Sequence, residues 1–120
     1  MLTNLQRAAM RVVQAQGLTE LASIWRAPAA TSGKIAPLVQ VAADVACRRW
    51  PAAQGTPRAA AILAAFVDLA ATRIDAIVIF LDTVDVRTGD EVRIGSTRYV
   101  VERSAQWTTI RACAVREIVP

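Results

Sequence analysis

The residue types that most often carry out enzyme chemistry are absent from this chain or scattered along it. The chain has no histidine, the commonest general base and metal ligand. Ser32, Ser96 and Ser104 fall in turns or loops rather than in a nucleophile elbow. The five glycines are dispersed and form no phosphate-binding loop. The sequence therefore predicts a protein that is not an enzyme and has no catalytic, cofactor-binding or metal-binding residues.

Acidic residues and cysteines offer two further kinds of site. Asp82, Asp85 and Asp90 resemble part of a calcium loop, but the glycine and the final glutamate of such a loop are missing. We interpret them as aspartates that cap turns. Cys47 and Cys113 lie 66 positions apart, outside any metal or redox spacing. They are expected to be reduced and buried, with a disulfide as the alternative.

The charge of the chain is unevenly distributed. Lys and Arg number 14 against 10 Asp and Glu, and 13 of the basic residues are arginines. Residues 1–60 hold 7 basic and 2 acidic residues, a net charge of +5, whereas residues 61–120 hold 7 and 8, a net charge of −1. This asymmetry predicts a cationic end that faces an anion or an unlike partner. A GC-rich genome, which favours Arg and Ala codons, is the alternative explanation of the arginines.

The first 17 residues are predicted to form one helix. Thr3 and Gln6 have the spacing of a capping box, and Gly17 stands where helices commonly end. Apolar side chains recur at helical spacing and form a stripe of Leu2, Leu5, Ala9, Val12 and Val13. The opposite face carries Arg7 and Arg11, which are interpreted either as solvated charge or as contacts with an acidic partner or DNA.

Residues 18–120 are predicted to be mainly β-structure. Alternating or β-branched runs predict strands over 20–27, 38–50, 73–81 and 110–118. A hairpin is predicted within 85–101, because Gly89-Asp90 and Gly95-Ser96 punctuate two alternating runs. Loops are expected over 28–37 and 104–109. The residues expected to be mostly buried are Val41, Val45, Ile79, Val92, Ile94 and Val101.

Residues 58–70 carry two conflicting signals. Ile62, Phe66 and Leu69 keep helical spacing in an alanine-rich run, but an apolar run of this kind can also be a strand. No apolar stretch approaches the roughly 20 residues of a membrane span, and no signal peptide is expected. Short strands with frequent turns predict one domain over residues 1–120, a small barrel or sandwich after the helix.

Four stretches, taken in order, resemble a known family. They are "QRAAMRVVQAQGLTELASIWR", "VACRRWPA", "RIDAIVIFLDTVDVRTGDEVRIGSTRYVVERS" and "TIRACAVREI". In this order they are similar to the small head–tail connector proteins of long-tailed bacteriophages, also called head-closure or stopper proteins. The resemblance covers most of the chain, and it lies in the order of the elements rather than in one diagnostic motif.

The resemblance implies a fold, an assembly and a location. The fold would be a small SH3-like barrel with an N-terminal helix and long loops, with extended chain over 58–72. Six or twelve copies would form a ring below the portal or its adaptor, at the head–tail interface of the virion. The ring would retain packaged double-stranded DNA and dock the tail proteins, without a catalytic residue, a cofactor or a membrane.

Within such a ring, cations from the basic half of the chain would face the DNA channel. The candidates are Arg7, Arg11, Lys34, Arg48 and Arg49. They would contact phosphates without reading sequence; the alternative is that they pair with acidic groups of the adaptor or of neighbouring subunits. Two other functions stay open: a small basic barrel that binds nucleic acid, and a tail-completion (terminator) protein. Stacking aromatics are expected on the first of these, yet Trp25, Trp50 and Trp107 are spread apart.

Overall fold

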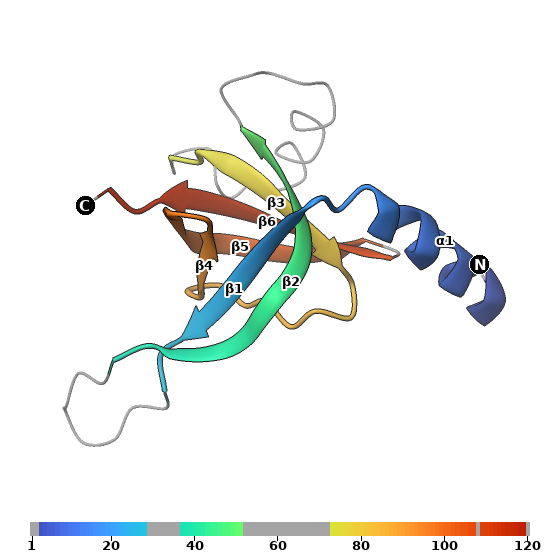
Figure 1. Cartoon of the computed structure of the whole chain (residues 1–120), viewed down its shortest axis with the longest axis horizontal. Helices are drawn as coiled ribbons and strands as arrows, with labels where there is room; N and C mark the ends of the chain where they lie inside the picture. Colours follow the sequence, from blue (N-terminus) through green and yellow to red (C-terminus); the bar gives the residue numbers. More distant parts are fainter. Residues whose placement is uncertain (1–2, 29–36, 52–72, 108, 120) are drawn as a thin grey trace.

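A closed antiparallel β-barrel with one N-terminal helix forms the described part of the chain, which comprises residues 3–28, 37–51, 73–107 and 109–119 of a computed structural model. The elements are α1 (Asn4–Gln16), β1 (Glu20–Arg26), β2 (Val39–Pro51), β3 (Ala76–Leu81), β4 (Glu91–Ile94), β5 (Thr97–Trp107) and β6 (Ile110–Glu117) (Figure 1). Around the barrel the strands follow the order β1-β2-β3-β6-β5-β4. The predicted mainly β fold, a small barrel after an N-terminal helix, is confirmed.

The predicted hairpin forms between β4 and β5. Ile94 lies opposite Thr97, so the turn has two residues and begins at Gly95, whose φ of +60° suits glycine. Gly89, at φ +92°, turns the chain before β4. Val92 and Tyr99 face each other across the ladder and are buried, as the alternation predicts. A local turn signal and a period of two thus fix this part of the barrel.

A bulge interrupts β2 and overturns one core prediction. Ala22 lies opposite Val45 and Ile24 opposite Ala42, so β2 contains an extra residue between the two pairs. Asp44, at φ +52°, lies in this irregular stretch. The extra residue shifts the alternation, and Ala42 rather than Val41 packs against the core. The prediction that Val41 is buried is therefore wrong: its side chain is 46% exposed.

The barrel buries apolar side chains on two sides of β3. Val78 and Phe80 point into the interior, whereas Ile77 and Ile79 belong to a second cluster with Ala112. Leu18, Trp50, Ile74, Ala105 and Ile110 pack against this second cluster. Burial of Ile79, Val92, Ile94 and Val101 is confirmed, and Val45 is half-buried. Because β3 is covered on both faces, its sequence is continuously apolar rather than alternating.

The predicted loop over 104–109 is wrong for its first four residues. β5 continues to Trp107, with Ser104 opposite Cys113 and Ala105 opposite Ala112. The polar composition of "SAQ" suggested a loop, but pairing with β6 satisfies the backbone and holds the segment extended. A register shift between Val101 and Arg103 also breaks the alternation that would have revealed a longer strand.

Some predictions concern residues outside the described ranges. These are most of the loop over 28–37, with Lys34, and the segment 58–72. Within the described ranges, no helix is both long enough and apolar enough to cross a membrane.

Candidate contact surface

The described residues contain no cluster suited to metal binding. No three His, Cys, Asp or Glu side chains in these ranges come together in a way that would hold a metal ion. Cys47 and Cys113 are free and buried, as predicted. Burial raises the pKa of the Cys47 thiol to about 11 and that of Cys113 to about 12. Both thiols are therefore inert core side chains at neutral pH rather than nucleophiles.

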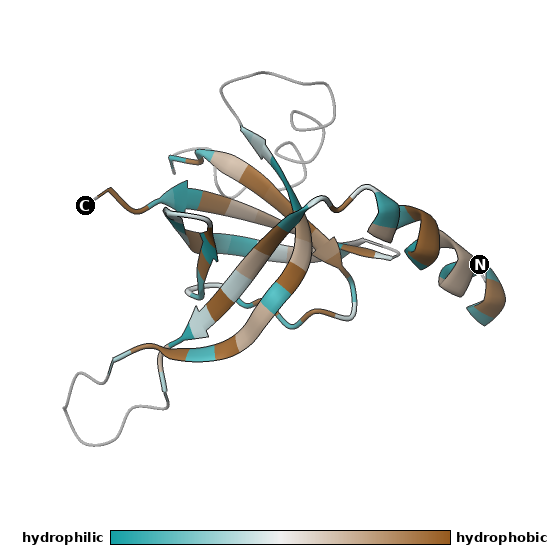
Figure 2. Cartoon of the chain, viewed as in Figure 1, coloured by the Kyte–Doolittle hydropathy of each residue, from teal (hydrophilic) through white to brown (hydrophobic). Residues whose placement is uncertain are grey.

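Helix α1 carries apolar surface that the rest of the described chain leaves uncovered. Its start is well defined, because Thr3 and Gln6 form the predicted capping box. None of its residues is buried, and Leu5, Val12 and Val13 are 81%, 62% and 67% exposed. Figure 2 shows these apolar stretches on a helix that projects from the barrel. A helix of 13 residues gains most of its stability from packing its apolar face, so this face is a candidate contact surface.

A two-pronged ion pair fixes α1 to the barrel. The Arg11 Nε and Nη2 atoms each donate a hydrogen bond of 2.8 Å to the carboxylate of Asp82, which follows β3. The Asp82 side chain is only 6% exposed, whereas that of Arg11 is 34% exposed. The hydrogen bonds from Arg11 lower the pKa of Asp82 below its ordinary value, and the charge of Arg7 acts in the same direction. The arginine face of α1 therefore turns toward the barrel, and the apolar stripe turns away from it.

Arg48 and Arg49 are adjacent on β2 and point to opposite sides of the strand. Arg49 donates hydrogen bonds to the Tyr99 hydroxyl at 3.0 Å and to the Glu20 carboxylate at 2.8 Å. The hydrogen bond to Tyr99 has the largest effect and raises the pKa of Arg49, and the neighbouring Glu20 carboxylate contributes in the same direction. The Arg48 guanidinium instead lies 5.6 Å from the centre of the Trp50 ring. Arg49, whose side chain is 27% exposed, is thus bound by two groups of its own chain.

The five predicted DNA contacts therefore have different surroundings. Arg11 and Arg49 each form an ion pair within the chain. Arg7 and Arg48 are exposed, and neither forms a salt bridge with another described residue. Lys34 lies outside the described ranges. Of the described candidates, Arg7 and Arg48 are the side chains that keep their charge available to an external anion.

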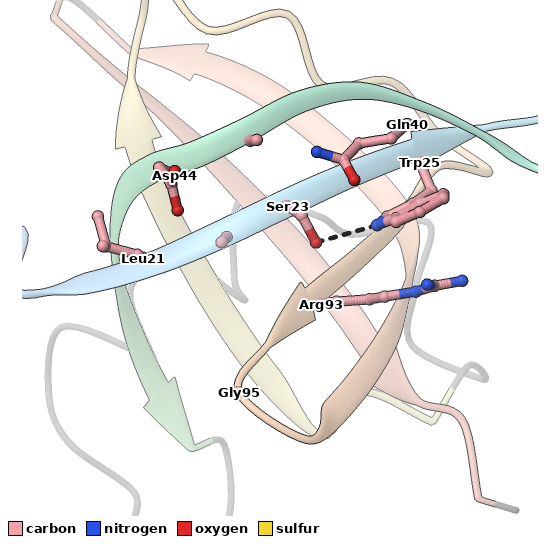
Figure 3. A pocket seen from close by; sticks show the side chains of 9 residues that line it. Leu21, Ser23, Trp25, Gln40, Asp44, Arg93 and Gly95 are labelled. Carbon is pink, nitrogen blue, oxygen red and sulfur yellow. Dashed lines mark hydrogen bonds between the residues drawn. The ribbon is translucent and has the colours of Figure 1, made fainter.

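A shallow groove on the outer face of β1, β2 and β4 was not predicted from the sequence. It is lined by Leu21, Ala22, Ser23, Trp25, Gln40, Ala43, Asp44, Arg93 and Gly95 (Figure 3). The Trp25 indole donates a 2.9 Å hydrogen bond to Ser23, and the Arg93 guanidinium lies 4.0 Å from the Trp25 ring centre. Alternation in "ELASIWR" indicates that Trp25 faces outward, but the hollow also depends on the β2 bulge, which has no local sequence signal.

Buried charges near this groove are compensated within the chain. Glu91 is 4% exposed and accepts hydrogen bonds from both Arg93 and Arg98. Burial opposes its charged form, but these two arginines more than offset burial and lower the pKa of Glu91 below its ordinary value. Asp90 is paired in a similar way, with its carboxylate Oδ2 atom 2.8 Å from Nη2 of Arg26. These groups stabilise the end of the barrel and are not free for ligands.

Compared with known protein families and with characterised proteins, the sequence matches no family model and has no significantly similar relative.

Proposed function

We propose that this protein is a structural subunit of a long-tailed bacteriophage, a head–tail connector or stopper that assembles into a ring below the portal or its adaptor. In this proposal the ring retains packaged DNA and provides the face on which the tail docks. The order of the sequence elements resembles that family, and the fold it implies agrees with the barrel and N-terminal helix.

The observation that carries the proposal is the uncovered apolar face of α1. Leu5, Val12 and Val13 are each more than 60% exposed on a helix whose position is fixed by Arg11 and Asp82. Exposed apolar surface on a rigid element is characteristic of a protein that completes its packing by binding another protein. A subunit of a ring meets this requirement.

The nucleic-acid-binding alternative finds less support in the aromatic side chains that the structure describes. Phe80 and Tyr99 are buried, and Trp50 packs against the second cluster, that of Ile77 and Ile79. The Arg93 guanidinium lies over the Trp25 ring. A stacking platform needs ring faces open to bases. These rings are occupied by packing instead, which favours the structural role.

The proposal is tested in phage particles. The chain should be detected in purified virions by mass spectrometry, in several copies per particle. Deleting its gene should give separate heads and tails, and the heads should have lost their DNA. Complete, infectious particles from the deletion strain, or a chain present only in infected cells and never in particles, would refute the role. A tail-completion protein would instead leave DNA-filled heads and aberrant tails.

A further inference from the structure

Helix α1 is attached to the barrel at two places. At its C-terminal end the chain passes through Gly17 into Leu18, which packs against the second cluster of the barrel. Near its middle, Arg11 donates its two hydrogen bonds to Asp82. Among the described residues these are the only side-chain hydrogen bonds between α1 and the barrel, and no residue of α1 is buried. The direction of α1 therefore depends on one ion pair and on the backbone at its C-terminal end.

The conformation of Gly17 does not call for glycine. Its φ of −85° and ψ of −7° lie in the right-handed helical region, which L-residues adopt readily. A methyl group on its Cα would lie 3.5 Å from the Gln14 carbonyl oxygen and 4.0 Å from Nη1 of Arg48, both ordinary contact distances. Alanine would fit here and is the better helix former. What glycine adds at this position is freedom of the backbone to change direction.

The chain on each side of Gly17 is well anchored. Helix α1 has a capping box at its start, and its last turn is closed by the hydrogen bond from the Gly17 N–H to the Gln14 carbonyl oxygen. On the barrel side, Leu18 is packed and the Glu20 carboxylate is bound by Arg49 at 2.8 Å. Two ordered bodies joined by one conformationally free residue are the arrangement of a hinge.

We infer that α1 is a hinged arm, which pivots about Gly17 and is held in the position shown in Figure 1 by the pair between Arg11 and Asp82 acting as a latch. This movement does not depend on the proposed function. Ala8 lies nine residues from the pivot, about 13 Å along the helix, so a rotation of about 30° moves it by about 7 Å. Opening the latch therefore changes the direction in which α1 presents its apolar stripe.

Distances between two spin labels test the latch. The labels are attached through Ala8→Cys on α1 and Ser96→Cys in the turn between β4 and β5, where both residues are exposed, whereas the native cysteines are buried. Dilution with unlabelled chain keeps the measured distances within one molecule. At pH 7 the distance distribution should be narrow, because the latch is closed. Arg11→Met opens the latch and keeps a good helix former, so the distribution should broaden while the helical content in circular dichroism stays unchanged.

A second substitution tests the hinge separately from the latch. Gly17→Ala, added to Arg11→Met, should narrow the distribution again, because alanine restricts the backbone at the pivot. Gln16→Ala is the matched control. It places the same residue one position earlier, where the side chain is exposed and the backbone is already helical, so the distribution should stay as broad as in Arg11→Met alone.

Four results would overturn the inference. A broad distribution with Arg11 in place would mean that the ion pair does not hold α1, and a narrow one in Arg11→Met would mean that other contacts hold it. Loss of helical content in Arg11→Met would mean that α1 unfolds instead of pivoting. Equal widths for Gly17→Ala and Gln16→Ala would mean that the movement is not located at Gly17.

Discussion

Asp44 lies at the bulge of β2 and has an unusual backbone conformation. Its φ of +52° lies in the left-handed region, which aspartate, asparagine and glycine adopt more readily than β-branched residues do. Asp44→Val should therefore lower the free energy of unfolding by about 1–3 kcal/mol, whereas Asp44→Asn should change it little. Urea denaturation of the two variants checks this. Equal stability of the two would mean that the backbone at residue 44 is not strained.

The two cysteines should be unreactive in the folded chain. Both are fully buried, and burial raises the pKa of Cys47 to about 11 and of Cys113 to about 12, so thiolate is scarce at pH 8. A thiol reagent should label neither residue in native protein and both in denaturant. Rapid labelling of either cysteine without denaturant would show that the barrel opens locally, because the reagent needs access as well as thiolate.

At the scale of the element, the packing of α1 against the end of β3 should depend on pH. Asp82 has a pKa below its ordinary 3.8 because it accepts hydrogen bonds from Arg11. A carboxylate with a lowered folded pKa adds stability that is present above pH 3.8 and is lost as pH falls through the folded pKa. Below that range α1 should detach from β3. NMR shifts of α1 residues, followed from pH 6 downward, measure this release.

Substitution of Asp82 provides the control for that titration. Asp82→Asn cannot ionise, so α1 should be loosely held at every pH and the acid step in the α1 shifts should disappear. Arg11→Met should return the pKa of Asp82 toward 3.8. A step that persists unchanged in Asp82→Asn would assign the titration to another carboxyl group.

Shortening a side chain to alanine should destabilise the protein far more in β3 than at residues 39–43 of β2. Ile79 is 3% exposed and belongs to the second cluster, with Ile77 and Ala112, so Ile79→Ala should lower the free energy of unfolding by about 2–5 kcal/mol. Val41→Ala should change it by about 0.5 kcal/mol or less, because Val41 is 46% exposed and packs against no core cluster. Denaturant melts of both variants give the comparison. A loss below about 0.5 kcal/mol for Ile79→Ala would remove Ile79 from the core.

Local signals were readable from the sequence, and non-local ones were not. The capping box of Thr3 and Gln6 and the turn at Gly95 involve residues a few positions apart, so composition and spacing suffice to predict them. The exposure of Val41 depends on the register between β1 and β2, which skips Val41 between the pairs Ile24–Ala42 and Trp25–Gln40. The length of β5 depends on its pairing with β6. The pair between Arg11 and Asp82 joins residues 71 positions apart. The sequence predicts that residues 1–60 are cationic, but the structure is needed to tell which of their arginines form ion pairs and which are exposed.

At the scale of the whole molecule, Arg7 is the α1 residue best placed to test contact with packaged DNA. It is exposed and forms no salt bridge within the described residues, whereas Arg11 is held by Asp82. If the proposed ring faces the channel, Arg7→Glu should increase DNA leakage from tailless heads while the ring stays bound. Arg7→Lys keeps the charge and should retain DNA like the unsubstituted chain. DNA content per head and ring occupancy are measured together.

Two other outcomes of the Arg7 experiment have clear meanings. Loss of the ring in Arg7→Glu would place this residue at a protein interface, and unchanged DNA retention would exclude it from the channel. Arg11→Glu is expected to behave differently, because it sets a second carboxylate against Asp82 and so displaces α1. It should reduce ring occupancy itself rather than DNA retention by an intact ring.

Closure of the barrel also sets the order of events during synthesis. Ala22 of β1 lies opposite Ile94 of β4, 72 positions later in the chain. The β1–β2 ladder can form early, but β1 lacks its second neighbour until β4 has left the ribosome. Pairing over so long a loop is slow, and a nascent chain with open strand edges is prone to aggregate. In the same way, β3 and β5 lack a neighbour until β6 has been made. Folding should therefore finish after translation has passed β6, and slowing translation before that point should lower the yield of soluble protein.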